Sequence, residues 1–437
     1  MKDKGKYLII SLLISLLIST SLITFKSMEL FNSSRQTIIE TQLKRNKLEG
    51  IFVDENGVEI TSSNKIGTPA KINYPSFHEL IGYNSLIYGE NRLRQVYRKY
   101  LFQDEQVKIH TTLSVPLQEY IYNSILKFNG SVIVMDNDTG AILALVSKGP
   151  VPLKINHSNI ETSIIKYMDE TANIEGSQLL RGVQTIDYLG STAKVIVAIA
   201  ALENLNKDSL IYEDTGSFNI PGCTIHNYQN KAYGKINMNE AFKYSSNTYF
   251  AYLSSELGWQ KIQKTTQKLL FNQEIDLGFT KLYSMYSFKT YDPSELITNA
   301  IGQGGCKASA LHLCMLYQMI MNNGKMIKPY LVNNIEINNH HILNHSKDIL
   351  TKYGKKSTYK ILKEALEICA NSYGLKSKDG KVYSKTGTAE SQNNNHTYIA
   401  CSTEQFTFVI SKENTNNTST ELIPLAQKII HYLELLY

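Results

Sequence analysis

The first marked feature of the hydrophobic pattern is an uncharged apolar run at residues 7–25. A helix over these 19 residues is about long enough, at roughly 1.5 Å per residue, to cross a hydrocarbon core of roughly 30 Å. Lys2, Lys4 and Lys6 precede the run and predict a cytoplasmic tail at 1–6, with all later residues outside the cytoplasm. The alternative is a cleaved signal peptide, whose apolar region is usually roughly 7–15 residues long and ends at an A-x-A site. We therefore expect an uncleaved membrane anchor.

The pattern of hydrophobic and polar residues becomes regular near residue 111. Residues 26–110 indicate a charged stalk and then a small module of short strands and turns. Ser131–Asp136 and Ala141–Ser147 are apolar strands, and the intervening turn of Asn, Asp, Thr and Gly predicts a hairpin. The other expected elements are a helix at 116–128, a mostly helical middle at 180–330, strands at 381–385, 397–402 and 405–411, and an amphipathic helix at 421–437.

Strands therefore lie at both ends of a helical middle. This order indicates an α/β (α+β) fold in which strands distant in sequence close one sheet and a helical subdomain is inserted between them. The predicted organisation is a tail at 1–6, an anchor at 7–25, a stalk and module at 26–110, and one main domain at 111–437.

Composition narrows the class of protein. Of the 437 residues, 42% are hydrophobic and 19% are charged, which excludes a disordered or fibrous chain. The net charge of +6 is spread without a basic stripe, so we expect no nucleic-acid partner. The five cysteines form neither a CxxC pair nor a disulfide framework, so we expect no metal site, with Cys223 and Cys401 as the exposed thiols.

Three short motifs follow one another in the main domain: SxxK at 191–194, SSN at 245–247 and KTGT at 385–388. SxxK alone is a weak signal, because the chain repeats it. The other copies begin at Ser62, Ser124, Ser163 and Ser357. KTG occurs once.

Context separates Ser191 from the other copies. It opens an apolar helix at 195–202, which predicts burial, and the start of a helix offers free N–H groups and a positive dipole end. Lys194 lies one turn on, within reach of the serine oxygen. Burial lowers the pKa of a lysine, and a neutral amine can take the proton of a nucleophilic serine. Taken alone, Ser191 would be an ordinary N-cap serine.

The other two motifs supply complementary groups. Ser245 can relay a proton and Asn247 can hold a substrate carbonyl, although a polar turn between helices explains the pair equally well in isolation. Gly387 lacks a side chain, so a peptide can approach the strand edge there. Lys385 and the neighbouring hydroxyls suit a terminal carboxylate, although a lysine at a strand end is an ordinary feature. The occurrence of all three motifs in this order, each in a suitable element, is more than chance would produce.

The chain resembles the transpeptidase domain of penicillin-binding proteins. The resemblance extends over 111–437 and includes the hairpin at 130–147 and further short motifs. These are Leu180-Arg181-Gly182, Ile301-Gly302-Gln303-Gly304, and Asn322-Asn323-Gly324 followed by Pro329. It implies the serine β-lactamase/transpeptidase-like fold, with a mainly antiparallel sheet flanked by helices. Residues 26–110 are too few for a glycosyltransferase domain, which implies the short, monofunctional class B type.

The resemblance also implies roles for the motif residues. Ser191 would be the acylated nucleophile, Lys194 the general base and Ser245 the proton shuttle. Asn247 would bind the peptide and Lys385 would complete the network. Thr386 and Thr388 would face the substrate carboxylate, with Gly387 between them, and the N–H groups of Ser191 and Thr388 would form the oxyanion hole. Substrates would be peptidoglycan stem peptides ending in D-Ala-D-Ala, β-lactams would acylate the serine, and no cofactor would be needed.

Some positions depart from the family pattern. Leu189 replaces the proline before the nucleophile's glycine, and Ala193 replaces a bulky residue. A Gly-Leu-Glu motif reads Arg92-Leu93-Arg94, and Tyr398 replaces a tryptophan after KTG.

Several functions remain compatible with the sequence. The expected one is a peptidoglycan D,D-transpeptidase held in the cell membrane, with a membrane glycan polymerase as a further partner. A D,D-carboxypeptidase or a β-lactamase would use the same serine with water as the acceptor. A divergent scaffold of the cell-wall machinery would bind without turnover.

Overall fold

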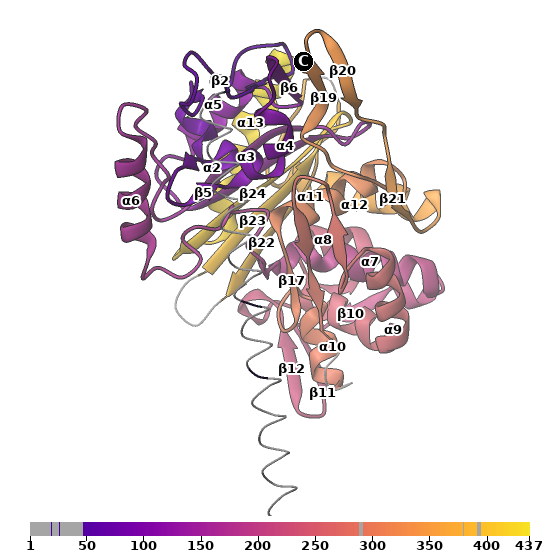
Figure 1. Cartoon of the computed structure of the whole chain (residues 1–437). Coiled ribbons are helices and arrows are strands. Elements are labelled where there is room, and N and C mark those ends of the chain that lie inside the picture. Colours follow the sequence, from indigo (N-terminus) through magenta and orange to yellow (C-terminus); the bar gives the residue numbers. More distant parts are fainter. Residues whose placement is uncertain (1–18, 20–25, 27–46, 288–291, 379, 391–394) are drawn as a thin grey trace, which may run out of the picture.

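The structure is a computed structural model that describes residues 47–287, 292–378, 380–390 and 395–437, together with Ser19 and Lys26 (Figure 1). The predicted tail at 1–6, the predicted anchor at 7–25 apart from Ser19, and the predicted stalk at 26–50 apart from Lys26 and residues 47–50 lie outside the described residues. Within the described part of the chain, no helix is both long and apolar enough to cross a membrane.

A five-stranded antiparallel sheet forms the centre, in the order β22-β23-β24-β7-β8 (Figure 1). The hairpin β7 (Gly130–Asp136) and β8 (Ile142–Lys148) is confirmed. β24 (Phe406–Thr415) pairs with β7, so strands distant in sequence do close the sheet. β23 (Asn395–Ser402) and β22 (Tyr383–Glu390) complete it, and β22 carries the KTGT motif within the strand.

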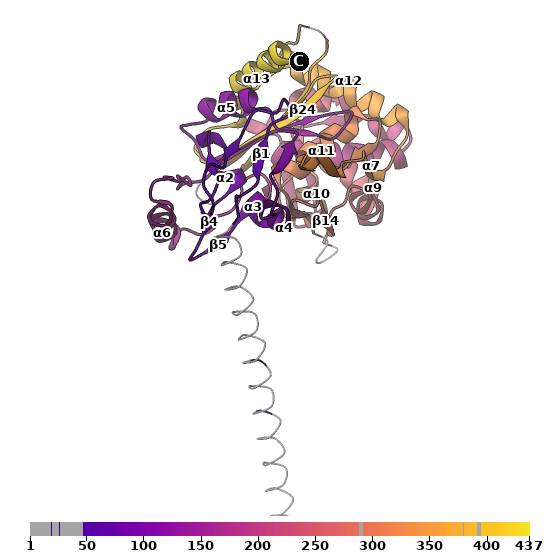
Figure 2. The same cartoon turned by 45° about the horizontal axis from the view of Figure 1, so that its top comes forward.

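Helices cover both faces of this sheet. Alternate side chains point to opposite faces, so Val132 and Val134 pack against α5 (Val115–Ser124) and α13 (Ile423–Leu436), which lie side by side in Figure 2. Ile133 and Met135 belong to the larger core on the other face, where α11 (Ala310–Met321) packs on β7 and β24. Burial on both faces explains why the strands are apolar throughout.

The same burial corrects one prediction. Cys401 is fully buried on β23, because helices cover both faces of that strand, whereas Cys223 is partly exposed. All five cysteines are free.

The middle of the chain contains helices as predicted, but short strands lie between them, so it is less helical than expected. Its helices are α7 (Lys194–Asn204), α8 (Met238–Tyr244), α9 (Asn247–Lys268), α10 (Pro293–Asn299) and α11, and α12 (Lys356–Ser372) follows. Every residue of α7 from Lys194 to Ala201 is buried, in keeping with its apolar sequence. Short hairpins lie between these helices, and the sequence did not predict them. Two of them are β11 (Ser217–Ile220) with β12 (Cys223–His226), and β14 (Glu274–Asp276) with β15 (Lys281–Tyr283).

The segment at 47–110 joins a second sheet. β1 (Ile51–Val53) pairs in parallel with β6 (Val107–Thr111), which pairs with β19 (Val332–Ile337), and β20 (His340–Asn344) lies at the edge. β6 therefore crosses the predicted boundary at residue 110. The division into a module and a main domain stays a prediction.

One departure from the family pattern has a structural consequence in this segment. Arg94, the last residue of Arg92-Leu93-Arg94, is 1% exposed and forms an ion pair with Glu49, which is 2% exposed. The guanidinium also donates to the carbonyls of Gly82 at 3.2 Å and Ala70 at 2.6 Å. The buried charge is thus paired and hydrogen-bonded, as a buried charge must be.

Candidate active site

The three motifs converge on one hydroxyl group, that of Ser245. Ser245 Oγ donates a hydrogen bond to Ser191 Oγ at 3.1 Å and accepts from Lys194 Nζ at 3.2 Å and Lys385 Nζ at 3.0 Å. A serine hydroxyl offers one donor and two acceptor positions, and these three contacts use all of them. Residues from three separate elements therefore share one hydrogen-bonded centre.

The turn before α7 presents the nucleophile candidate. Ser191 lies in a short 3₁₀ turn, Gly190–Ala193, and stays partly exposed while its neighbours are buried. Gly190 has φ +53°, and a Cβ there would lie 2.6 Å from the carbonyl oxygen of Thr388. A Cβ on Gly387 would lie 2.7 Å from the carbonyl oxygen of Leu189. The glycines on both sides therefore let β22 approach the Ser191 turn closely, a role for Gly387 that the sequence did not predict.

Ser245 occupies a strained turn between α8 and α9. Its φ of 54° and ψ of 37° are left-handed, which is uncommon for a residue other than glycine. The following residue, Ser246, caps α9 by accepting from Tyr249 N at 3.0 Å. This geometry brings the Ser245 hydroxyl between the two lysines.

Two buried residues outside the motifs hold that turn. Asn227 Oδ1 accepts from the backbone N–H of Asn247 at 2.8 Å, and Asn227 Nδ2 donates to both oxygens of Asp214. Asp214 also accepts from Ser246 Oγ at 2.7 Å. Neither Asp214 nor Asn227 was predicted, since nothing in a hairpin sequence marks a contact with a turn farther along the chain.

Lys194 is fully buried beside this turn. Its Nζ donates to the carbonyl oxygen of Ser245 at 2.7 Å and to Asn247 Oδ1 at 2.8 Å. Burial and, second, the positive charge of Lys385 hold the pKa of the Lys194 amine well below its usual range, while the Cys369 thiol opposes the shift. Among the described residues, the hydrogen bonds connect Lys194 to Ser191 through Ser245 Oγ. Both causes disfavour the charged form of the amine, which lies one hydroxyl group away from Ser191.

β22 supplies the third side of the site. Lys385 is 1% exposed and its Nζ also donates to the carbonyl oxygen of Thr386 at 3.0 Å. Thr386 Oγ1 donates to the hydroxyl of Tyr373 at 3.2 Å. Thr388 Oγ1 donates to Ser419 Oγ at 3.1 Å and accepts from Ser419 N at 3.0 Å. Tyr373 and Ser419 were missed, because Tyr373 follows a surface helix and Ser419 lies in a polar run without a motif.

The other SxxK serines lie outside this cluster. Ser62 bonds to Asn73, Ser124 to the carbonyl of Tyr120 and Ser163 to the carbonyl of Asn159, while Ser357 is exposed at the start of α12. Tyr398, which replaces the family's tryptophan, pairs with Gly387 across the sheet and is 4% exposed, so it belongs to the core.

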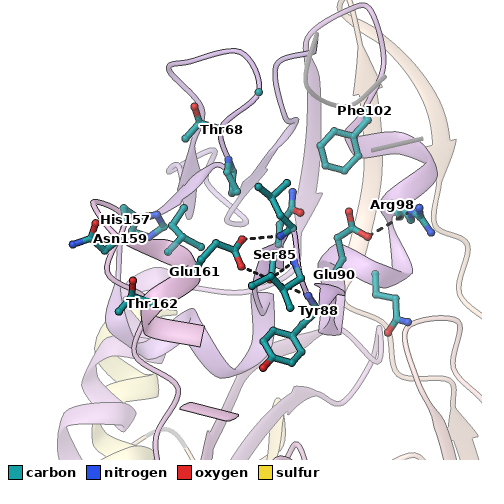
Figure 3. A pocket seen from close by; sticks show the side chains of 18 of the residues that line it. Thr68, Ser85, Tyr88, Glu90, Arg98, Phe102, His157, Asn159, Glu161 and Thr162 are labelled. Atoms are coloured by element: carbon teal, nitrogen blue, oxygen red, sulfur yellow. Dashed lines mark hydrogen bonds and ion pairs between the residues drawn. The ribbon is translucent and has the colours of Figure 1, made fainter. Parts of the chain in front are cut away.

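A hollow of about 920 Å³ lies elsewhere, in the segment at 47–110 and the start of α6 (Ile160–Thr171). Figure 3 shows Glu161 of α6 accepting from Ser85, and Glu90 paired with Arg98 at 3.5 Å. No motif residue lines this hollow, so it is separate from the candidate site. Within the described residues, no group of three or more His, Cys, Asp or Glu could hold a metal ion.

Comparison with known sequences gives one family. Residues 130–422 match the family model described as the penicillin binding protein transpeptidase domain. The peptidoglycan D,D-transpeptidase MrdA of Acinetobacter baumannii is 26% identical over 240 residues, which are 51% of this chain and 35% of that protein. An FtsI homolog of Mesostigma viride is 26% identical over 260 residues, 54% of this chain and 40% of that protein. The match thus spans less than half the length of these curated relatives.

Comparison with solved structures shows a shared fold. The D,D-transpeptidase domain of a peptidoglycan glycosyltransferase from Eggerthella lenta has a TM-score of 0.79 and 23% identity, covering 90% of this chain and 100% of that one. The penicillin G acyl-enzyme complex of penicillin-binding protein A from Mycobacterium tuberculosis has a TM-score of 0.81 and 17% identity, covering 89% and 100%. The mixed α/β fold implied by the sequence resemblance is confirmed.

Proposed function

The chain belongs to the penicillin-binding protein transpeptidase family, and from that premise we propose that it is a membrane-anchored serine D,D-transpeptidase. It cross-links peptidoglycan stem peptides ending in D-Ala-D-Ala through an acyl-enzyme on Ser191, and penicillin acylates the same serine. The observation that carries this proposal is the Ser245 hydroxyl, which contacts Ser191, Lys194 and Lys385 within 3.2 Å. No cofactor takes part in the proposed reaction.

Acylation begins with a proton transfer. The two N–H groups of a neutral Lys194 amine are used on the carbonyl of Ser245 and on Asn247, which leaves its lone pair free to accept a proton. When the hydroxyl groups rotate, Ser191 donates to Ser245 Oγ and Ser245 donates to Lys194 Nζ. Ser191 Oγ then attacks the carbonyl carbon between the two D-alanines, and its proton passes to Lys194. The N–H groups of Ser191 and Thr388 stabilise the oxyanion.

Collapse of the tetrahedral intermediate breaks the D-Ala-D-Ala bond. Ser245 passes the proton from Lys194 to the departing amine of the terminal D-Ala, and the remaining peptide stays as an ester on Ser191. The amine of a second stem peptide then attacks this ester, and its proton returns by the same route. A new peptide bond forms and Ser191 regains its hydrogen, so the enzyme is restored.

Lys385 has two functions in this scheme. Its positive charge disfavours protonation of Lys194, and with the hydroxyls of Thr386 and Thr388 it attracts the carboxylate of the donor peptide or of penicillin. Asn247 holds the backbone of the donor. Gly387 leaves room for that backbone beside β22.

The proposed location follows from the apolar run at 7–25, which supports a single-pass anchor with a cytoplasmic N-terminus and an extracytoplasmic catalytic domain. There the enzyme meets its substrate strands, and a membrane glycan polymerase that makes them is its proposed partner. The full chain should fractionate with membranes, and its N-terminal sequence should begin before Phe25. A mature N-terminus after Phe25 would indicate a cleaved signal peptide.

Two assays on the detergent-solubilised full chain test the chemistry. A fluorescent penicillin should label the protein covalently, and Ser191→Ala should abolish the labelling while Ser62→Ala, Ser163→Ala and Ser357→Ala retain it. Labelling that survives Ser191→Ala would refute the proposal. Mass spectrometry after incubation with a stem pentapeptide and an amine acceptor should detect the cross-linked product. A tetrapeptide alone would indicate a carboxypeptidase, and unchanged peptides would indicate a scaffold.

A further inference from the structure

Tyr373 directly follows α12 and belongs to none of the three motifs. Its side chain is half-buried, and its hydroxyl oxygen accepts hydrogen bonds from Lys385 Nζ at 3.5 Å and from Thr386 Oγ1 at 3.2 Å. These are two of the groups that the proposed function assigns to the ligand carboxylate. One hydroxyl group therefore joins the ammonium and the hydroxyl that would meet a ligand on β22.

A buried thiol on α12 interacts with the Tyr373 hydroxyl. Cys369 lies one turn earlier on that helix and is fully buried. Burial raises the pKa of the Cys369 thiol, and the charge of Lys385, a hydrogen bond from Tyr373 and the charge of Lys194 oppose this rise. A tyrosine hydroxyl has one proton to donate. If the sulfur takes that proton, the lone pairs of the oxygen face Lys385 and Thr386.

We propose that Tyr373 is a positioning residue, whose hydroxyl oxygen accepts from Lys385 and Thr386 and so fixes the position of the Lys385 charge that attracts a ligand carboxylate. This inference rests on the proposed function and adds a residue to it. Tyr373 acts through Lys385 and Thr386 and need not touch the reacting atoms. Its effect should therefore appear in ligand capture, whereas the limiting rate of acylation of Ser191 should change little.

The test is Tyr373→Phe in the full chain, which keeps the ring and removes only the hydroxyl. Acylation rates are measured against the concentration of benzylpenicillin and of benzylpenicillin methyl ester, which lacks the carboxylate. The half-saturating concentration of benzylpenicillin should rise about 2- to 12-fold, the factor that corresponds to one ordinary hydrogen bond. The limiting rate and the reaction of the ester should stay at the wild-type values.

Two further variants sharpen the result. Tyr383→Phe is the matched control, because Tyr383 also lies on β22 but its hydroxyl donates to Glu404 at 2.6 Å, and we expect wild-type acylation. Thr386→Val removes one partner of Tyr373. Adding Tyr373→Phe to Thr386→Val should raise the half-saturating concentration of benzylpenicillin by a smaller factor than Tyr373→Phe does in the wild type. The reason is that the effects of two residues that act through one contact are not additive.

The outcomes are distinct. Equal losses with benzylpenicillin and its ester, or a loss confined to the limiting rate, would overturn the positioning function, as would an unchanged Tyr373→Phe protein. If the wild-type chain is not acylated at Ser191, the proposed function itself fails. If the wild type is acylated and only the Tyr373 prediction fails, the proposed function stands without this residue.

Discussion

Replacing Lys385 with methionine should shift the pH dependence of acylation toward higher pH. Methionine keeps most of the length of the side chain and removes its charge. Lys194 must be neutral to accept the proton of Ser191, so acylation rises with pH as Lys194 loses its own proton. Without the positive charge of Lys385, the pKa of Lys194 increases toward its ordinary value, because one of the two causes that lower it is gone. A higher pH is then needed for the same fraction of neutral amine.

The structure sets the size of this effect. Lys194 Nζ and Lys385 Nζ lie 3.2 and 3.0 Å from the same oxygen, Ser245 Oγ. The two nitrogens are therefore at most about 6 Å apart, where two positive charges at an effective dielectric constant of about 20 repel by about 3 kcal/mol. That energy corresponds to about a 100-fold change in the fraction of neutral Lys194 at a pH below its pKa. Both side chains are almost fully buried, so solvent screening between them is small.

The assay is the second-order rate constant of acylation by benzylpenicillin, measured from pH 5 to pH 10 at constant ionic strength. In the acidic range Lys385→Met should be slower by about 100-fold from this effect, and the deficit should shrink as the pH rises. A residual deficit at high pH would measure the lost attraction for the ligand carboxylate. The control is Lys381→Met, which removes the same charge from a side chain that is 60% exposed and paired with Glu367. If Lys385→Met lowers the rate by one constant factor at every pH, Lys385 does not control the protonation of Lys194.

Two other substitutions test separate parts of the structure. Lys194→Arg should be inactive in penicillin acylation, slower by at least the ~10²–10⁴-fold typical of a lost general base, because a guanidinium keeps its proton; an active variant would show that another group is the base. Arg94→Met should lower the free energy of unfolding by about 3–5 kcal/mol in a urea titration, since it leaves the carboxylate of Glu49 buried without its partner. Adding Glu49→Gln to Arg94→Met should recover part of the lost free energy of unfolding, because it removes the unpaired charge. Equal free energies of unfolding in the single and double variants would show that the buried carboxylate is not the cause of the loss.

The local pattern of the sequence was enough for much of the fold. The hairpin β7–β8, the strands β23 and β24 and the C-terminal helix were predicted close to their observed bounds, because each has a regular apolar pattern. The strand predicted at 381–385 instead runs from Tyr383 to Glu390. The short hairpins between the central helices were not predicted. Their strands have three or four residues and partly exposed side chains, so their hydrophobic pattern is weak.

Burial of single residues was harder to predict. Cys401 was expected at the surface, yet it is fully buried. The sequence around it shows a strand but does not show that helices from distant parts of the chain cover both of its faces. Arg94 is the opposite case, a charged residue that is buried because Glu49 and two carbonyl groups lie where its side chain ends.

The chemical groups of the site can be identified from the sequence: a serine at the start of an apolar helix, a lysine one turn later, and a single KTG motif in a strand. How these groups meet depends on the fold. Ser245 is 54 residues from Ser191 and 140 residues from Lys385. Packing of α7, α9 and β22 brings the side chains of Ser191 and Lys385 to the hydroxyl of Ser245. The supporting groups, among them Asn227 and Tyr373, have no local pattern of their own. Their positions follow from contacts between distant segments, which no short stretch of sequence encodes.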